Sequence, residues 1–511
     1  MKAKQLLTLS LAVLMVMGIV TRGRAGSLES LNIFESPGKK QTNKDFKPAP
    51  FKMKTNFGDL QFLGGGFPVG ATAQKLYDEL DLQRATQAYM DFMPALSVYG
   101  IIKGQIRDFG FKTASDYGVF ADRMEPSELY LTGNDVSIYA VASLDLKVDG
   151  PTVVEVPPRM LGTANDAYFK YLCDFGPSGP DKAKGGKFLF LPPGYKGEKP
   201  DGYFVIHSPS YRIWAMMRGA PDVVGIGDKA IEWYKKYLKV YPLKTGPREF
   251  RAINMSGRGI NSLVPEDGSA FEMLNEIIQY EPSELFEMEQ LGRLASLGIV
   301  KGKSFSPDAR MQRILDQGAK QGTAMARTIV YASRDPEIHY WPGKQWEKMF
   351  NTNTEFLRDG YLDPDSRTLW MYSAIVVSPM LISKTPGWGT GYITSFRDED
   401  GVYLDGAKNY RLNVPANVPA GRFWAVTIYD PATRSLLGNE GPNTVTSLRN
   451  PEVNSNGSVD VYFGPKAPKG KENNWGATVP GKGWFVVFRF YGPLEGYIEK
   501  TWVLNDIELI K

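Results

Sequence analysis

The sequence predicts a mainly β protein with a helical middle region. Short segments rich in aromatic and β-branched residues lie on both sides of a central stretch whose apolar residues have helical spacing. Gly, Pro and Asn separate the short segments, which is typical of antiparallel sandwiches. A chain of 511 residues is long enough to form several domains.

The first segment, residues 1–25, has the features of a secretory signal peptide. Two lysines precede an apolar run from Leu6 to Val20, and Gly23 and Ala25 stand at −3 and −1 of a cleavage site before Gly26. We therefore expect an exported protein, periplasmic or extracellular. No later segment is apolar enough to span a bilayer, so we expect no transmembrane segment in the mature chain.

Charge and cysteine content narrow the classes of partner. The signal segment carries four basic and no acidic residues, so the 60 Lys and Arg and 56 Asp and Glu of the chain become balanced after cleavage. A neutral chain gives no reason to expect a nucleic-acid partner. The single cysteine, Cys173, allows no internal disulfide, and its apolar surroundings favour a buried, inert thiol.

The next two segments are an arm with a helix and then a sandwich. In residues 26–106 a polar arm precedes a helical pattern from Thr72 to about Ile106, and Pro94 is expected to break or kink that helix. In residues 107–222 strand-like segments follow one another between turns, which predicts an antiparallel sandwich.

The last two segments are a helical region and a second sandwich. In residues 223–366 helices are expected at Ile226–Val240, Ser269–Leu297 and Pro307–Tyr331. In residues 367–511 many short strands joined by Pro/Gly loops predict a jelly roll or a related sandwich.

One strand of this last segment contains an unusual charge. Its residues alternate between two faces, and both faces are apolar: Trp484, Val486, Phe488 and Phe490 on one, and Phe485, Val487, Arg489 and Tyr491 on the other. A charge inside a hydrophobic layer needs a partner or a ligand. A buried carboxylate pair for Arg489 is the favoured interpretation, and a ligand-facing guanidinium is the alternative.

Arginines and aromatic residues on predicted strands form the candidate binding site. The candidate residues are Asn134, Tyr139, Tyr211, Arg212, Trp214, Arg218, Arg489 and Tyr491. Side chains of these types can line a concave site and bind a carboxylate-bearing or sugar-like ligand. The competing interpretation is a structural Arg–carboxylate pair within an aromatic core.

Catalytic signals are weak. His207, in a strand and next to Ser208, is a weak candidate for a general base, although a structural histidine is the favoured interpretation. Two histidines and one cysteine exclude a His-rich or Cys-based zinc site, and we expect neither a metal nor a cofactor. The sequence therefore leaves open whether the protein is an enzyme.

Long ordered motifs resemble a pair of known families over about residues 60 to 511. The N-terminal part, with GNDVSIYAVASLDL, GPTVVEVPP and FVIHSPSYRIWAMMRG, resembles domain-of-unknown-function family 1254. The C-terminal part, with YITSFRDEDGVYLDGAKNYRLNVP, FWAVTIYD and NWGATVPGKGWFVVFRFYGPLEG, resembles family 1214. The resemblance implies an Ig-like sandwich, a helical region and a jelly roll. Many members have an Asp where this chain has Val136, so no role of that Asp is implied here.

Three hypotheses for the function follow. The leading one is an exported protein that binds a small polar or amphipathic ligand in an interdomain or sandwich cleft lined by Arg and aromatic residues. The first alternative is a periplasmic hydrolase that uses His207 or carboxylates. The second alternative is an oligomeric envelope scaffold, which would associate with copies of itself.

Overall fold

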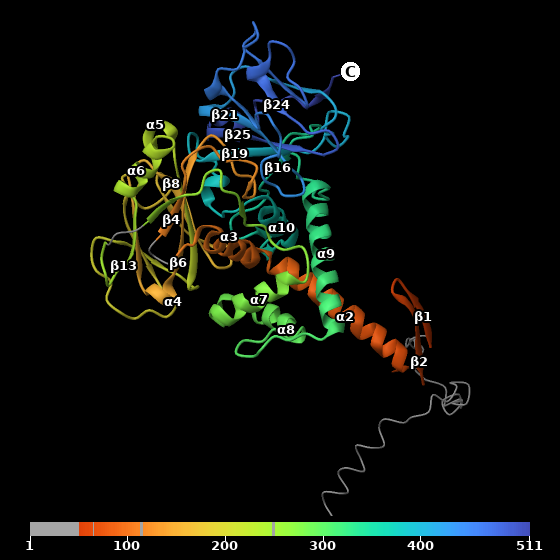
Figure 1. Ribbon diagram of the computed structural model, residues 1–511. Helices are drawn as coiled ribbons and strands as arrows, with labels where there is room; N and C mark the ends of the chain where they lie inside the picture. Colours follow the sequence, from red (N-terminus) through yellow and green to blue (C-terminus); the bar gives the residue numbers. More distant parts are fainter. Residues whose placement is uncertain (1–50, 65, 113–115, 248–250, 511) are drawn as a thin grey trace, which may run out of the picture. The chain divides into compact units, whose positions relative to one another are not determined.

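The computed structural model describes residues 51–64, 66–112, 116–247 and 251–510 (Figure 1). The predicted signal peptide and most of the predicted arm lie outside these residues. The described chain divides into two compact units at Leu80. The first unit contains the antiparallel strands β1 (Lys52–Thr55), β2 (Gly58–Leu63) and β3 (Phe67–Pro68) and the first half of helix α2 (Gly70–Asp91).

The second unit begins with the end of α2 and contains helix α3 (Met93–Phe109). Of the two expected effects of Pro94, a break or a kink, the structure has the break, between Asp91 and Met93. Pro94 lies in the first turn of α3, where its missing N–H costs no hydrogen bond. Helix α3 ends at Gly110, whose φ of 64° is the left-handed conformation that glycine adopts without strain.

A six-stranded and a four-stranded sheet form the first sandwich. The larger sheet has the order β14 (Arg251–Asn254), β4 (Asp116–Phe120), β6 (Ile138–Asp145), β12 (Arg212–Gly219), β8 (Leu161–Asp166) and β9 (Tyr171–Phe175). The smaller sheet has the order β11 (Phe204–His207), β10 (Gly186–Leu191), β7 (Thr152–Val156) and β13 (Lys239–Pro242). Small and aromatic residues fill the core of this sandwich, such as Ala140, Ala142, Phe188 and Phe190.

The second sandwich pairs a five-stranded with a four-stranded sheet. The five-stranded sheet has the order β16 (Glu347–Lys348), β19 (Thr390–Ser395), β25 (Phe485–Pro493), β21 (Ala420–Tyr429) and β22 (Thr444–Thr446). The other sheet has the order β24 (Trp475–Ala477), β23 (Val459–Gly464), β20 (Tyr410–Val414) and β26 (Glu508–Leu509). Two short pairs complete the strands of this unit: β5 (Glu128–Leu129) with β15 (Ile260–Asn261), and β17 (Leu357–Arg358) with β18 (Tyr361–Leu362).

The pairing of the strands differs in part from the prediction. Most neighbours are antiparallel, as predicted, but four pairs run parallel: β10 with β11, β4 with β14, β5 with β15, and β23 with β24. Strands β13 and β14 lie beyond residue 222, the expected end of the first sandwich, and still join its sheets. Strand β14 is parallel to β4 and therefore needs a long crossover connection, whereas β13 is antiparallel to β7.

Helices connect and cover the sandwiches (Figure 1). They are α4 (Leu146–Asp149), α5 (Pro221–Val224), α6 (Asp228–Tyr237), α7 (Ser269–Tyr280), α8 (Met288–Ser296), α9 (Ala309–Tyr331), α10 (Pro364–Ser373) and α11 (Glu495–Ile498). The helix predicted from Ser269 to Leu297 is interrupted by a 3-10 turn at Ser283–Leu285. The helix predicted to start at Pro307 starts at Ala309, and Asp308 is its N-cap: the Asp308 side chain accepts a hydrogen bond of 2.7 Å from Met311 N–H.

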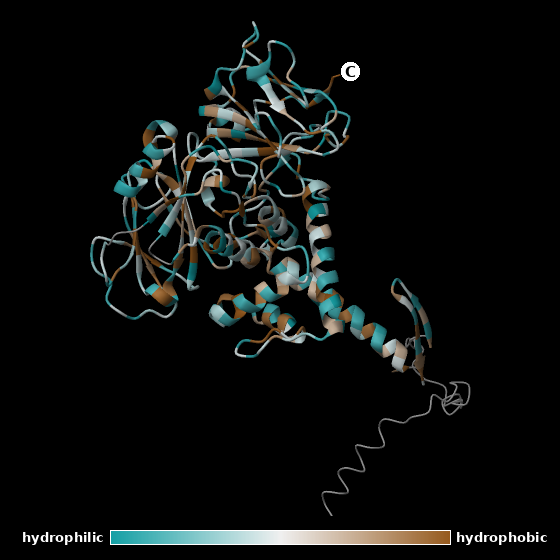
Figure 2. Ribbon diagram, viewed as in Figure 1, coloured by the Kyte–Doolittle hydropathy of each residue, from teal (hydrophilic) through white to brown (hydrophobic). Residues whose placement is uncertain are grey.

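A core of helices and sheet faces joins these parts. Helix α3 packs against α7 and α10, and α10 packs against α9. In Figure 2 the strands of both sandwiches carry hydrophobic segments, while the helices alternate between hydrophilic and hydrophobic residues. Buried residues from α3, α7, α9 and α10 contact the outer faces of the six-stranded and five-stranded sheets. In the described residues no helix is long and apolar enough to cross a membrane.

Candidate functional site

The predicted alternation of β25 is confirmed. Trp484, Val486, Phe488 and Phe490 all lie in the core of the second sandwich. Phe485 and Val487 face the opposite way, into the core shared with the helices. Arg489 lies on this second face and is only 2% exposed.

The predicted carboxylate partner of Arg489 is not present among the described residues. Its Nη2 atom instead donates a hydrogen bond of 2.6 Å to the main-chain carbonyl of Thr132. The guanidinium also lies over the rings of Tyr392 and Tyr429, at 5.6 and 5.5 Å from their centroids. The favoured interpretation was therefore wrong about the partner, although it was right about the burial. The sequence indicates a charge in an apolar strand, but only the tertiary fold decides which acceptor reaches it.

A cavity of about 100 Å³ lies beside Arg489, and we name it the Arg–Tyr cavity. Its walls are largely apolar and include four methionines, two phenylalanines and Trp214. Its polar lining residues include two arginines, three tyrosines and several small hydroxyl or amide side chains: Arg218, Arg489, Tyr130, Tyr139, Tyr392, Thr132, Thr163, Thr390, Asn134 and Ser378. Neither Asp, Glu, His nor Cys is among its lining residues.

Strand geometry aims three of the predicted residues into this cavity. Residues 212, 214, 216 and 218 of β12 share one face, because alternate side chains of a strand point the same way. The intervening Ile213, Ala215 and Met217 lie in the sandwich core. Trp214 and Arg218 therefore reach the cavity from β12, and Tyr139 reaches it from the neighbouring strand β6, directly opposite Arg218.

Arg218 and Arg489 approach the cavity from two different sheets. Arg218 is half-buried, and its Nη2 donates to Thr390 Oγ1 at 3.0 Å. Its guanidinium lies 5.6 Å from the ring centroid of Tyr491. In the part of the chain that the structure describes, neither arginine forms an ion pair with a carboxylate. Two guanidiniums therefore border one low-dielectric cavity, and only hydroxyl, carbonyl and aromatic groups contact them.

Some donors at this site have no protein partner. Among the described residues, Nη1 of Arg489 and the indole N–H of Trp214 are buried without a hydrogen-bond acceptor. Both residues line the cavity. Buried polar groups in folded proteins almost always have a partner, so each exception needs an explanation. A ligand with several hydrogen-bond acceptors, bound in the cavity, would explain both exceptions.

Burial keeps the hydroxyl groups of Tyr139 and Tyr491 neutral, because it raises the pKa of both. Burial is the largest influence on Tyr139 and raises its pKa, against the opposing effect of the Arg218 and Arg489 charges. The pKa of Tyr491 is raised for the same reason. The hydroxyl of Tyr139 accepts a short hydrogen bond from Asn134 Nδ2, and Asn134 Oδ1 in turn accepts from Val136 N–H. Neutral hydroxyls can orient an anion without repelling it.

The other predicted residues lie near the cavity or away from it. Tyr491 stacks on Phe423 with ring centroids 3.9 Å apart, and it is not among the residues that line the cavity. Tyr211 and Arg212 lie at the opposite end of β12, where Arg212 is 4.0 Å from the ring centroid of Tyr280. Glu281 accepts hydrogen bonds from the backbone N–H groups of both residues. This end of the strand is a structural cluster that packs the sandwich against α7.

The weak catalytic candidate lies outside the cavity. His207 is exposed at the end of β11, an edge strand of the four-stranded sheet. Cys173 is buried, as predicted, and burial strongly raises the pKa of its thiol. In the described residues, no group of three His, Cys, Asp or Glu side chains is arranged to hold a metal ion.

A second, larger cleft of about 490 Å³ adjoins the first, and we name it the lysine cleft. Phe350, Leu381 and Tyr392 line both. The lysine cleft is also lined by Lys348, Lys384 and Lys500, which sequence reasoning missed. These lysines stand in unrelated segments, so no pattern in the sequence indicates that they converge.

Two family models match this chain, and the matched regions contain both arginines of the Arg–Tyr cavity. Residues 118–242 match the model of the protein of unknown function DUF1254, and residues 389–495 match that of the protein of unknown function DUF1214. The predicted resemblance to this pair of families is confirmed. The DUF1254 region supplies Tyr139, Trp214 and Arg218 to the Arg–Tyr cavity. The DUF1214 region supplies Tyr392 and Arg489, so the cavity lies between the two.

One solved structure supports the fold, and it carries no information on function. The VPA0106 protein from Vibrio parahaemolyticus has a TM-score of 0.52 and 17% identity, over 84% of this chain and 100% of that chain. A putative uncharacterized protein from Burkholderia cenocepacia has a TM-score of 0.39 and 12% identity, over 85% of this chain and 96% of that one. A search of curated proteins finds no match.

Proposed function

We propose that this protein binds a small amphipathic anion, most simply a short-chain carboxylate, in the Arg–Tyr cavity. The observation that carries the proposal is the pair Arg218 and Arg489, which border one cavity without a carboxylate of the described chain. A guanidinium presents a planar set of donors that matches a carboxylate. Nη1 of Arg489 and the indole N–H of Trp214 have no acceptor among the described residues, so both can donate a hydrogen bond to a bound anion.

The remaining walls favour an apolar body on the same ligand. Methionine, phenylalanine, leucine and valine account for eleven of the 27 lining residues, and Trp214, Ala374 and Ile375 add further apolar surface. An apolar cavity of roughly 150 Å³ holds benzene, so about 100 Å³ suits a short aliphatic group. Methionines adapt their shape to a ligand, which favours a class of related molecules over one compound.

Binding is better supported than hydrolysis at this place. A hydrolase of the type considered would need a general base or paired carboxylates beside the ligand. The cavity lining contains neither His nor a carboxylate, and His207 is exposed on an edge strand.

The second alternative, an oligomeric scaffold, has no observation in its favour that compares with the two arginines of the cavity.

Export and the finer fold assignment are part of the same proposal. The signal peptide predicted for residues 1–25 supports an exported protein that meets its ligand in the periplasm or outside the cell. The resemblance to the two families supports an Ig-like assignment for the first sandwich and a jelly-roll assignment for the second. A strand-by-strand comparison of a crystal structure with those two folds tests the assignment.

A calorimetric titration tests the binding function. We expect wild-type protein to bind short straight-chain carboxylates with one site per chain, and Arg218→Gln and Arg489→Met to lose that binding. Arg422→Gln is the matched control, because Arg422 is exposed on β21 and lines neither cavity. Neutral amides of the same chain length should bind weakly or not at all. Equal binding of acids and amides would contradict the proposal.

A further inference from the structure

The lysine cleft has the composition of a second anion site. Lys348, Lys384 and Lys500 line it, whereas neither Asp nor Glu does. Within the described residues none of these lysines forms an ion pair. Its other polar lining residues include amides and hydroxyls, such as Asn351, Thr352 and Ser383. Such a cleft presents positive charge and neutral hydrogen-bonding groups to whatever enters it.

The lysines of the cleft, Lys348, Lys384 and Lys500, come from three separate segments of the chain. Lys348 is on β16, where it pairs with Ile393 of β19. Lys500 follows α11 and lies 5.0 Å from the ring centroid of Tyr340. Burial and the nearby charge of Lys500 lower the pKa of Lys348, although Glu337 and Asp335 act in the opposite direction. Like charges held close together favour a bound anion, because the anion relieves their repulsion.

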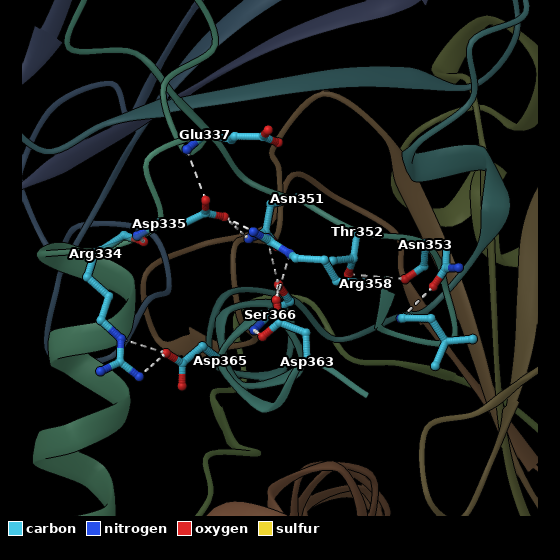
Figure 3. A network of polar contacts seen from close by, with 12 residues as sticks. Arg334, Asp335, Glu337, Asn351, Thr352, Asn353, Arg358, Asp363, Asp365 and Ser366 are labelled. Carbon is cyan, nitrogen blue, oxygen red and sulfur yellow. Dashed lines mark hydrogen bonds and ion pairs between the residues drawn. The ribbon is translucent and has the colours of Figure 1, made fainter. Parts of the chain in front are cut away.

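One wall of the cleft is held by the polar network of Figure 3. Asn351 lines the cleft, and its Nδ2 donates to Asp335 Oδ2 at 2.9 Å. Arg358 donates to the same Asp335 oxygen at 2.7 Å and forms an ion pair with Asp363 at 3.0 Å. Asp363 in turn caps α10 by accepting from Ser366 N–H at 3.0 Å. These contacts hold the segment from Asn351 to Asn353 against α10, so this wall of the cleft is already in place before a ligand binds.

The two cavities are neighbours along β19. Thr390 and Tyr392 line the Arg–Tyr cavity, while Gly391 and Tyr392 line the lysine cleft. Tyr392 is also the cross-strand partner of Arg489. The shared residues Phe350, Leu381 and Tyr392 are apolar or aromatic, so they can contact the hydrocarbon part of a molecule that extends from one cavity into the other.

We propose that the ligand carries two anionic groups joined by an apolar chain, with one group at Arg218 and Arg489 and the other at the lysines of the cleft. This inference rests on the proposed function and names its ligand class, of which straight-chain dicarboxylates are the simplest members. The inner arginines fix one carboxylate by directed hydrogen bonds. The outer lysines act as point charges and tolerate chains of different length.

Titration of matched acids tests the inference. Straight-chain monocarboxylates and α,ω-dicarboxylates of equal chain length are titrated into wild-type protein and into the Lys348→Gln and Lys500→Gln variants. We expect the best dicarboxylate to bind wild-type protein about tenfold more tightly than the monocarboxylate of equal chain length. One additional charged hydrogen bond contributes a free energy of about this size. Each lysine variant should lose most of this gain and leave monocarboxylate affinity unchanged. Lys469→Gln, at an exposed lysine that lines neither cavity, is the control.

The outcomes separate the two proposals. If monocarboxylates bind through Arg489 and dicarboxylates bind no more tightly, the binding function stands and the second anion site is wrong. A gain from the second carboxylate that persists in both lysine variants also overturns the lysine cleft as its site. If wild-type protein binds neither class of acid, the proposed function fails and the inference fails with it.

Discussion

Nη2 of Arg489 donates a hydrogen bond of 2.6 Å to the main-chain carbonyl of Thr132, which lies 357 residues earlier in the chain. Thr132 has a φ of 45°, a conformation that β-branched residues rarely adopt. Its Oγ1 donates to Ser373 O and its N–H to Arg434 O, both at 2.6 Å. Strain of this kind persists where surrounding contacts hold it, and it is common at functional sites.

The stability of Arg489→Met distinguishes a ligand-facing charge from a buried ion pair. The substitution removes one charged hydrogen bond, a loss of about 1.5–3 kcal/mol. It also removes the desolvation penalty of a buried cation, which has a similar magnitude and the opposite sign. We expect the free energy of unfolding to change by less than about 1 kcal/mol in denaturant titrations, with carboxylate binding lost. A destabilisation of about 3–5 kcal/mol would instead indicate a broken ion pair.

Buried carboxyls should make the protein less stable as the pH rises from about 5 to about 8. Burial raises the pKa of Glu281 to about 7, against the hydrogen bonds from Tyr211 and Arg212 N–H. The folded state therefore holds this proton up to pH 7, while the unfolded chain loses it near pH 4.5. The stabilisation is fully present below pH 4.5 and is lost as the pH rises through 7. Burial raises the pKa of Glu128 and Glu347 in the same direction.

Glu281→Gln should remove the contribution of this residue to the pH dependence. We expect the difference in unfolding free energy between pH 5 and pH 8 to be smaller in the variant, by up to about 3 kcal/mol. Urea titrations at the two pH values measure it, and Glu499→Gln, at an exposed site, is the control. An identical pH dependence in wild type and Glu281→Gln would contradict the raised pKa.

Cys173→Ala should leave ligand binding intact. The thiol is buried on β9 and belongs to the core of the first sandwich, away from the lining of both cavities. Loss of its small apolar volume should cost about 1 kcal/mol in the free energy of unfolding. Thermal unfolding and a carboxylate titration check both parts. A folded variant that no longer binds would show that the thiol takes part in the function.

The mature chain should begin at Gly26 when the protein is produced in an exporting cell. The reason is the order of a basic segment, an apolar run and small residues at positions 23 and 25. N-terminal sequencing of periplasmic material measures the cleavage point. Recovery of intact Met1 in a membrane fraction would contradict the signal peptide.

Local patterns predicted the strands well because period and composition are local properties. The alternation of β25 assigned Val486 and Phe488 to one core and Phe485 and Val487 to another, as the structure has them. The same pattern identified Arg489 as a buried charge. Its acceptor could not be predicted, because the Thr132 carbonyl reaches it only through the packing of the DUF1254 region against the DUF1214 region.

The candidate site was predicted in part. Five of the eight predicted residues line the Arg–Tyr cavity: Asn134, Tyr139, Trp214, Arg218 and Arg489. Arg212 was grouped with Arg218 because they are close in sequence. Six residues of a strand span about 20 Å, so the two arginines lie at opposite ends of β12. The rise per residue of a β-strand separates Arg212 from Arg218, and this rule could have been applied to the sequence alone.

Comparative titration of wild-type protein and Arg489→Met with straight-chain carboxylates tests the central claim most directly. The account predicts that wild-type protein binds an acid with one site per chain. A ligand at 100 times its dissociation constant should then stabilise the fold by about 2.7 kcal/mol. It also predicts that Arg489→Met folds and melts like wild type but shows neither binding nor ligand-induced stabilisation. Binding of the same acid with equal affinity by both proteins would contradict the account.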